Sequence, residues 1–157
     1  RPVARHRGHY GMVCQLRGWL PDAIGGVYWV YQDNPYIGPY VPVYAGCSRT
    51  AACYQEYDPE NYSDRSARWT IDFVDNLCNL RFQEASKLVQ EMRRPFEERM
   101  FADQERIEKE ALRLHARSPR RAKAYLTEYC LGLMEQVPPL YIRMRERLLT
   151  MFTNNRE

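Results

Sequence analysis

The pattern of hydrophobic and polar positions changes near residue 64 of this 157-residue chain. Before that point, apolar residues occur in short runs separated by glycine and proline, which is typical of strands and turns. After it, charged residues separate apolar positions at the three- and four-residue spacing of amphipathic helices. The pattern predicts an α+β chain, with a β-rich segment at residues 1–63 and a helical region at residues 64–157.

Three short runs in the first segment predict strands, at residues 9–16, 26–31 and 40–44. The second run places Val, Tyr and Trp side by side, as expected of a strand covered on both faces. Pro42 in the third run favours a sheet edge or a bulge, because proline has no N–H to donate to a neighbouring strand. Residues 45–63 are mostly polar and predict a loop.

The second segment predicts a long helix that begins at Ser63 or Asp64, either of which can cap it. Pro95 should kink this helix or start a new one. Ser118 followed by Pro119 predicts the start of another helix, since proline is favoured at the first helical position. The apolar face expected for the long helix comprises Trp69, Phe73, Leu77, Leu80, Leu88 and Met92.

These elements do not complete a layered domain by themselves. Amphipathic helices need an apolar surface to cover, and three strands leave sheet edges without partners. We therefore expect further strands from a partner chain or from an upstream segment of the same precursor.

Composition and charge weigh against several classes of protein. The formal net charge of +3 is small, and acidic and basic residues are interspersed, so nothing here favours nucleic-acid binding. No apolar run approaches the roughly 20 residues of a membrane-spanning helix, so we expect no membrane insertion.

The cysteine content favours neither a metal site nor a complete disulfide framework, because the five cysteines are an odd number and form no CxxC motif. Cys47 and Cys53 have a spacing compatible with a small disulfide ring, and two unpaired thiols are the alternative. Cys14 lies inside a predicted strand and is interpreted as a packing residue. We expect no metal.

Three runs occur in the same order as in a known enzyme family. They are LPDAIGGVYW at residues 20–29, YVPVY at residues 40–44 and YSDRSARW at residues 62–69. In these runs the chain resembles the C-terminal portion of the cysteine dipeptidases of the N-terminal-nucleophile hydrolase superfamily, which include lactobacillal dipeptidase A and are related to the secernins. Members often carry Asp-Asp after the Trp-containing strand, where this chain has Gln32-Asp33-Asn34-Pro35.

The resemblance implies a four-layer αββα fold and the hydrolysis of dipeptide amide bonds without a metal or organic cofactor. In that mechanism an N-terminal Cys attacks the carbonyl, and its own α-amino group serves as the base. The chain starts with Arg1-Pro2, so we expect the nucleophile on an N-terminal chain of the same precursor or an upstream segment. The other implied partners are the dipeptide substrate and, as in relatives, further copies of the protein.

Candidate site residues lie near the first two predicted strands. Related bile-salt and penicillin acylases carry an Arg near the nucleophile, and Arg7 in the cluster RHRGH matches it best. A guanidinium there could bind a substrate carboxylate or lower the thiol pKa. His9 and Asp33 are further substrate-binding candidates, since Asp33 ends a strand where active-site loops often lie. Solvated charges and a plain turn are the alternatives.

Two other functions compete with the dipeptidase. A non-catalytic subunit that packs on a partner protein would also present a β-rich patch beside helices. A stand-alone enzyme using Cys47, Cys53 or a His is disfavoured, because no thiol here has an evident base and orienting partner in the sequence. The resemblance favours export to the periplasm or the cell exterior, with the cytoplasm as the alternative.

Overall fold

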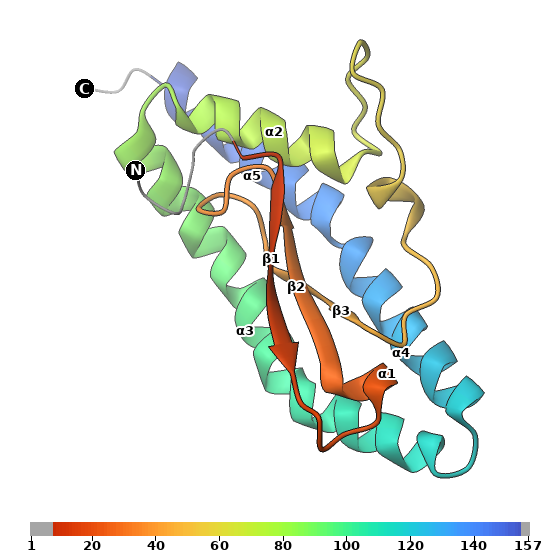
Figure 1. The fold of residues 1–157 in the computed structure, drawn as a ribbon. Coiled ribbons are helices and arrows are strands. Elements are labelled where there is room, and N and C mark those ends of the chain that lie inside the picture. Colours follow the sequence, from red (N-terminus) through yellow and green to blue (C-terminus); the bar gives the residue numbers. More distant parts are fainter. Residues whose placement is uncertain (1–7, 155–157) are drawn as a thin grey trace.

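The computed structural model describes residues 8–154 and has an α+β fold, as the sequence predicts. Figure 1 shows β1 in front of the long helices, with α3 running along the strands. None of the described helices is long and apolar enough to span a membrane. The elements in chain order are β1 (Tyr10–Leu16), α1 (Asp22–Gly25), β2 (Gly26–Gln32), β3 (Val41–Tyr44), η1 (Ala52–Tyr54), α2 (Ala67–Cys78), α3 (Phe82–His115), α4 (Pro119–Met134) and α5 (Val137–Thr153).

The three strands form one antiparallel sheet in the order β1-β2-β3. β3 lies at an edge, which agrees with the expectation from Pro42, and the register opposes Trp29 to Pro42. β2 buries Val27 and Trp29 on the face toward the helices, where the Trp29 ring packs 4.7 Å from that of Phe101 on α3. Tyr28 on the other face is exposed, so the described residues cover this strand on one face and not on both.

The region predicted as one long helix consists of two helices, because the helical structure is interrupted between Cys78 and Phe82. The N–H of Leu80 bonds to Leu77 O in a tight last turn, and Arg81 has φ −145° and ψ 73°, which no helix adopts. α3 then runs through Pro95 without interruption, so no new helix starts there.

The start and the buried face of α2 also differ from the prediction. Ser66 caps the helix by accepting a hydrogen bond from Trp69 N at 3.3 Å, whereas Asp64 pairs with Arg145 on α5. The buried stripe contains Ile71 and Val74 in place of the larger side chains predicted from the sequence. Those larger side chains, Trp69 and Phe73, pack their rings at steep angles against the ring of Tyr62 in the preceding loop.

The loop between β2 and β3 is fixed by the helices behind it. Arg93 on α3 donates to Tyr36 O and Gly38 O at 2.9 and 2.8 Å, and Tyr141 on α5 donates to Ile37 O at 2.5 Å. A Cβ atom at Gly38 would lie 2.3 Å from Gln32 O, so a larger residue does not fit there. The end of β2 is therefore held rigidly against the helices.

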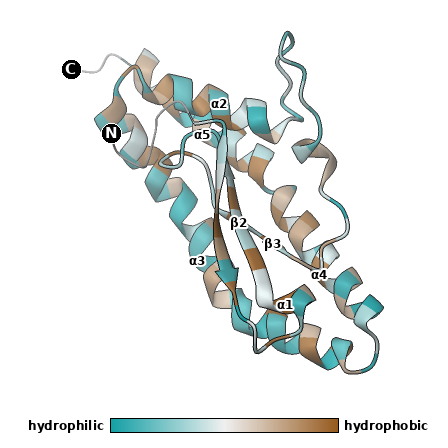
Figure 2. Ribbon diagram, in the orientation of Figure 1, coloured by the Kyte–Doolittle hydropathy of each residue, from teal (hydrophilic) through white to brown (hydrophobic). Residues whose placement is uncertain are grey.

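Strand β1 presents apolar side chains to solvent within the described part of the chain. Tyr10, Met12 and Leu16 are 74%, 53% and 71% exposed, and Trp19 beyond the strand is 79% exposed. Figure 2 shows hydrophobic segments along β1 and β2, whereas α3 is mostly hydrophilic. β1 pairs with β2 on one side, and no other described strand pairs with it.

All five cysteines are free thiols. Cys14 is exposed on β1, so its interpretation as a packing residue is wrong for the described structure. Cys47 and Cys53 are both half-buried and unpaired, which matches the second of the two alternatives for them.

Candidate functional site

A polar pocket lies where β1 begins and β2 ends. The two positions meet because the strands are antiparallel, with Tyr10 opposite Gln32, and Asp33 N donates to His9 O at 2.8 Å. Two of the three predicted site residues, His9 and Asp33, therefore line the same pocket, and the third, Arg7, lies outside the described residues. The pocket has a volume of about 580 Å³ and is lined by Gly8, His9, Asp33, Arg68, Asp72, Asp75, Asn76 and Asn79.

The backbone at Asp33 has an unusual conformation. Its φ of 66° is left-handed, and Asp33 is the only non-glycine residue in the described chain with a positive φ. Asp and Asn tolerate this region better than other side chains. The next residue, Asn34, closes the turn by accepting a hydrogen bond from Tyr36 N at 2.9 Å. The turn aims the Asp33 side chain at α2 and away from solvent.

The Asp33 carboxylate is buried and only partly paired. It is 5% exposed, and its Oδ1 lies 2.9 Å from Nη1 of Arg68 on α2. Its Oδ2 is buried and has no hydrogen-bond partner among the described residues. Burial raises the pKa of Asp33 to about 6, against the opposing effect of Arg68, and the neighbouring carboxylates Asp72 and Asp75 raise it further.

Helix α2 supplies the rest of the charge in the pocket. Arg68 also lies 3.7 Å from Asp72, one turn further along the helix. Asp75 is 6% exposed and accepts a hydrogen bond from Asn34 Nδ2 at 2.9 Å. The pocket thus holds three carboxyl groups and one guanidinium, so its lining is acidic when all of them are ionised.

The chemistry of this pocket favours a cationic ligand group. A buried carboxylate oxygen without a donor can accept hydrogen bonds from an ammonium group, and the acidic lining would attract that group. No thiol lines the pocket, and the described residues contain no group of side chains arranged to bind a metal ion.

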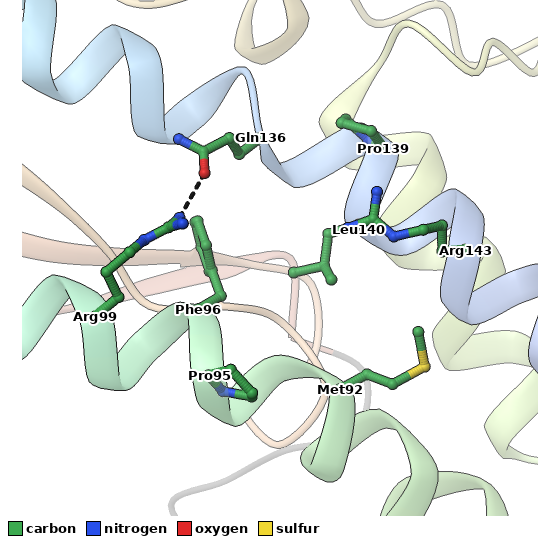
Figure 3. A pocket seen from close by; sticks show the side chains of 8 residues that line it. All are labelled: Met92, Pro95, Phe96, Arg99, Gln136, Pro139, Leu140 and Arg143. Carbon is green, nitrogen blue, oxygen red and sulfur yellow. Dashed lines mark hydrogen bonds between the residues drawn. The ribbon is translucent and has the colours of Figure 1, made fainter.

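A second pocket, shown in Figure 3, lies between α3 and α5 and has a volume of about 290 Å³. Its floor includes Phe96 and Leu140, and Arg99 donates to Gln136 Oε1 at 2.5 Å. No carboxyl, thiol or imidazole group lines it. It offers no acid, base or nucleophile for a reaction.

The sequence model of Peptidase family C69 matches residues 1–94. The chain belongs to peptidase family C69. It is 30% identical over 123 residues to "Probable dipeptidase B" of Streptococcus pyogenes serotype M1. The aligned segment covers 78% of this chain and 24% of that relative. It is 32% identical over 69 residues to a "Probable dipeptidase" of Latilactobacillus sakei. That aligned segment covers 44% of this chain and 14% of the relative.

The dipeptidase family predicted from the sequence is thus confirmed, and the chain spans about a quarter of the length of the first of these relatives. The polar pocket at the start of β1 and the end of β2 is called the strand-end pocket below. Every residue that lines it lies within the part that matches the C69 model. Most of the residues around the pocket in Figure 3 lie beyond it. The strand-end pocket is therefore the candidate site of this C69 chain.

Sequence reasoning missed the contribution of α2 to the pocket. Arg68, Asp72 and Asp75 follow each other at spacings of four and three residues, which places them on one face of the helix. The spacing can be recognised in the sequence, but the contact between this helix face and the loop after β2 cannot. Only the fold shows that Asp33 lies opposite Arg68.

Proposed function

We propose that this C69 chain forms part of a cysteine dipeptidase and supplies one wall of its substrate site. The nucleophilic cysteine would lie on another segment or another chain of the same precursor. Membership of the family supports the reaction class, and the relatives' names include dipeptidases. The observation that carries the assignment of the site is the buried, half-paired carboxylate of Asp33 in an acidic pocket.

The proposed role of Asp33 follows from the chemistry of a dipeptide. Such a substrate carries one free α-ammonium group, one amide bond and one carboxylate. The ammonium group would enter the acidic pocket lined by Asp33, Asp72 and Asp75 and pair with these carboxylates. Bringing that charge beside Asp33 and Asp75 would also lower the pKa of Asp33, because an opposite charge favours the ionised form.

In the proposed reaction, a cysteine thiolate from outside this chain attacks the carbonyl of the amide bond. The C–N bond breaks, the leaving amine takes up a proton, and an acyl-thioester remains on the cysteine. Water then hydrolyses the thioester and restores the thiol. The proposal needs no metal and no organic cofactor.

The exposed apolar residues of β1 support the idea that more polypeptide packs here. Tyr10, Met12 and Leu16 are exposed beside a strand edge that has no partner among the described residues. An apolar groove of about 520 Å³ between β1 and α3 is lined in part by Trp29 and Phe101. A further strand and its side chains would cover both, as the predicted αββα arrangement requires.

The first test uses the full polypeptide that contains this chain. We expect it to hydrolyse dipeptides, and we expect Asp33→Asn to lower kcat/KM at least about tenfold, which corresponds to the loss of one charged contact. N-acetylated dipeptides supply the decisive comparison, because they lack the ammonium group. The wild-type enzyme should prefer the free amine, and the variant should lose much of that preference.

Asp103→Asn is a matched control, since Asp103 forms an exposed ion pair with Arg106 on α3, away from the pocket. Its kcat/KM should equal that of the wild type. An unchanged preference in a folded Asp33→Asn protein would rule out the ammonium site. A full polypeptide without dipeptide hydrolysis would instead favour a non-catalytic subunit.

N-terminal sequencing of every chain in the purified protein tests where the nucleophile lies. The proposal expects a chain that begins with Cys. Active enzyme in which no chain begins with Cys would contradict the mechanism.

A further inference from the structure

The pocket between α3 and α5 has an apolar floor with a positive charge at each end. Phe96 and Leu140 form the middle of the floor and are 7% and 8% exposed. The other apolar residues of the lining are Met92, Pro95 and Pro139. Figure 3 shows Arg99 at one end of this floor and Arg143 at the other, with Phe96 and Leu140 between them.

Arg99 is held in place by two contacts. Its guanidinium lies over the Phe96 ring, 5.5 Å from the ring centroid, and donates to Gln136 Oε1 at 2.5 Å. Gln136 is itself oriented, because its Nε2 donates to Gly132 O at 2.6 Å and its oxygen is left for Arg99. A guanidinium has five N–H donors, so the bond to Gln136 leaves others for a ligand. Since the side chain is already positioned, a ligand would bind it at little further cost in side-chain entropy.

Arg143 supplies a second positive charge from α5. It is exposed, and among the described residues it forms no hydrogen bond and no ion pair. No carboxyl group lines the pocket, so neither guanidinium is neutralised by a lining residue. The charge of the lining is therefore opposite to that of the strand-end pocket, and it is complementary to an anion.

We propose that the pocket between α3 and α5 binds a small organic carboxylate with an apolar or aromatic body. The body would cover Phe96 and Leu140, and the carboxylate would accept hydrogen bonds from Arg99. Arg143 would add attraction for the negative charge. A free amino acid or dipeptide fits less well, because its ammonium group would lie near two guanidinium groups. The inference therefore concerns a different ligand from the substrate of the proposed dipeptidase and does not depend on that proposal.

The size of the pocket sets the size of the ligand. Its volume of about 290 Å³ is near the lower limit of roughly 300 Å³ for ligand pockets, so it offers room for a body of about one aromatic ring. An anion as small as acetate would leave the apolar floor uncovered. Both the body and the charge should thus contribute to binding.

The test is an NMR titration of the full polypeptide, labelled at its methionine methyl groups, with 3-phenylpropionate. Met92 lines the pocket, whereas Met12 lies on β1 and does not. We expect the Met92 resonance, assigned from its loss in Met92→Leu, to shift with a Kd below about 1 mM, while that of Met12 stays unchanged. Two probes separate the contributions, because 3-phenylpropanamide keeps the body without the charge and acetate keeps the charge without the body. Each should bind at least about tenfold more weakly.

Charge variants identify the groups that bind the carboxylate. Arg99→Gln and Arg143→Gln should each weaken the binding of 3-phenylpropionate at least about fivefold, and added salt should weaken it in the wild type. Arg120→Gln is the matched control, because Arg120 is an exposed arginine at the opposite end of α4 from Gln136. Its affinity should equal that of the wild type.

Three outcomes would overturn the proposal, and all three are read on the wild-type protein. One is equal affinity for 3-phenylpropionate and its amide, which would leave no role for the charge. Another is binding that leaves the Met92 resonance unchanged. The third is no binding up to about 10 mM, as expected if another segment of the full polypeptide covers the pocket.

Discussion

Two arginine–carboxylate pairs lie at opposite ends of the β1–β2 hairpin, and they are satisfied to very different degrees. At the end where β1 finishes, Arg17 donates to both carboxylate oxygens of Glu108 at 2.6 and 2.7 Å. Glu108 also accepts hydrogen bonds from Gln104 and Tyr44, both at 3.0 Å. At the other end, Asp33 has one contact to Arg68 and a buried oxygen without a hydrogen bond among the described residues.

The pKa values of the two carboxyl groups, Glu108 and Asp33, show the same difference. Burial alone would raise the pKa of Glu108, but hydrogen bonds from Arg17 and Gln104 hold it below its usual value. At Asp33 burial prevails, and the pKa rises to about 6. A buried pair whose hydrogen bonds are complete serves the fold, whereas an incomplete pair beside a pocket is a candidate for ligand binding. The predictions below separate these two roles.

The largest expected effect is the loss of Glu108. In Glu108→Ala the mostly buried Arg17 guanidinium would lose its counter-charge, and the buried Tyr44 hydroxyl would lose its acceptor. We expect the free energy of unfolding to fall by about 2 to 4 kcal/mol, because a removed partner leaves the other charge unpaired. Urea denaturation would measure this loss of stability, provided that the m-value is the same in the variant and the wild type.

Glu110→Ala is the matched control on the same helix. Glu110 pairs with Arg113 at 2.6 Å, but this pair lies on the solvent side of α3. Its loss should leave the urea midpoint nearly unchanged. Similar losses in both variants would contradict a structural role specific to the Arg17–Glu108 pair.

A smaller effect is expected at the cap of α2, the helix that carries Arg68. Ser66→Ala removes the acceptor of Trp69 N and should lower the free energy of unfolding by about 1 kcal/mol. Arg68 lies in the first turn of α2, so the variant should also weaken the ion pair between Arg68 and Asp33. The pKa of Asp33 should then rise, which the pH dependence of its carboxyl NMR chemical shift would show. Ser63→Ala serves as the control, because Ser63 is one of the two caps that the sequence predicts and it donates to Glu56 instead.

How far the sequence could predict this fold is clear from the strands. All three were placed to within one residue, because glycine, proline and polar residues bound their apolar runs. The phase of α2 could not be predicted, since the sequence offers two apolar stripes. The stripe with Trp69 and Phe73 is covered by Tyr62 from the preceding loop, and the stripe with Ile71 and Val74 enters the core.

The candidate site was predictable only where it lies at strand ends. His9 and Asp33 flank the hairpin, and an antiparallel pairing brings them together, so local sequence was sufficient. The contribution of α2 depends on a contact between Asp33 and Arg68, and a hydrogen bond from Ser48 N to Thr127 Oγ1 joins the loop after β3 to α4. Such contacts between distant segments follow from packing, which no periodicity in one chain reveals.

The last expected effect is a difference in pH dependence. The folded pKa of Asp33 is raised from 3.8 to about 6, so the stability that protonation provides is fully present below about pH 4 and is lost as the pH rises through 6. Asn at this position does not titrate. Relative to the wild type, Asp33→Asn should therefore gain stability between pH 4 and 6, and the difference should be constant above pH 7.

Glu108 should show the opposite sign, because its folded pKa is lowered from 4.5. Its contribution is present above that value and is lost as the pH falls through the lower, folded pKa. Urea midpoints of the wild type, Asp33→Asn and Glu108→Gln between pH 3 and 8 would resolve the two windows. Should the Asp33→Asn difference instead remain flat from pH 4 to 6, the Asp33 carboxylate would be as well satisfied as that of Glu108, and the contrast between the two ends of the hairpin would disappear.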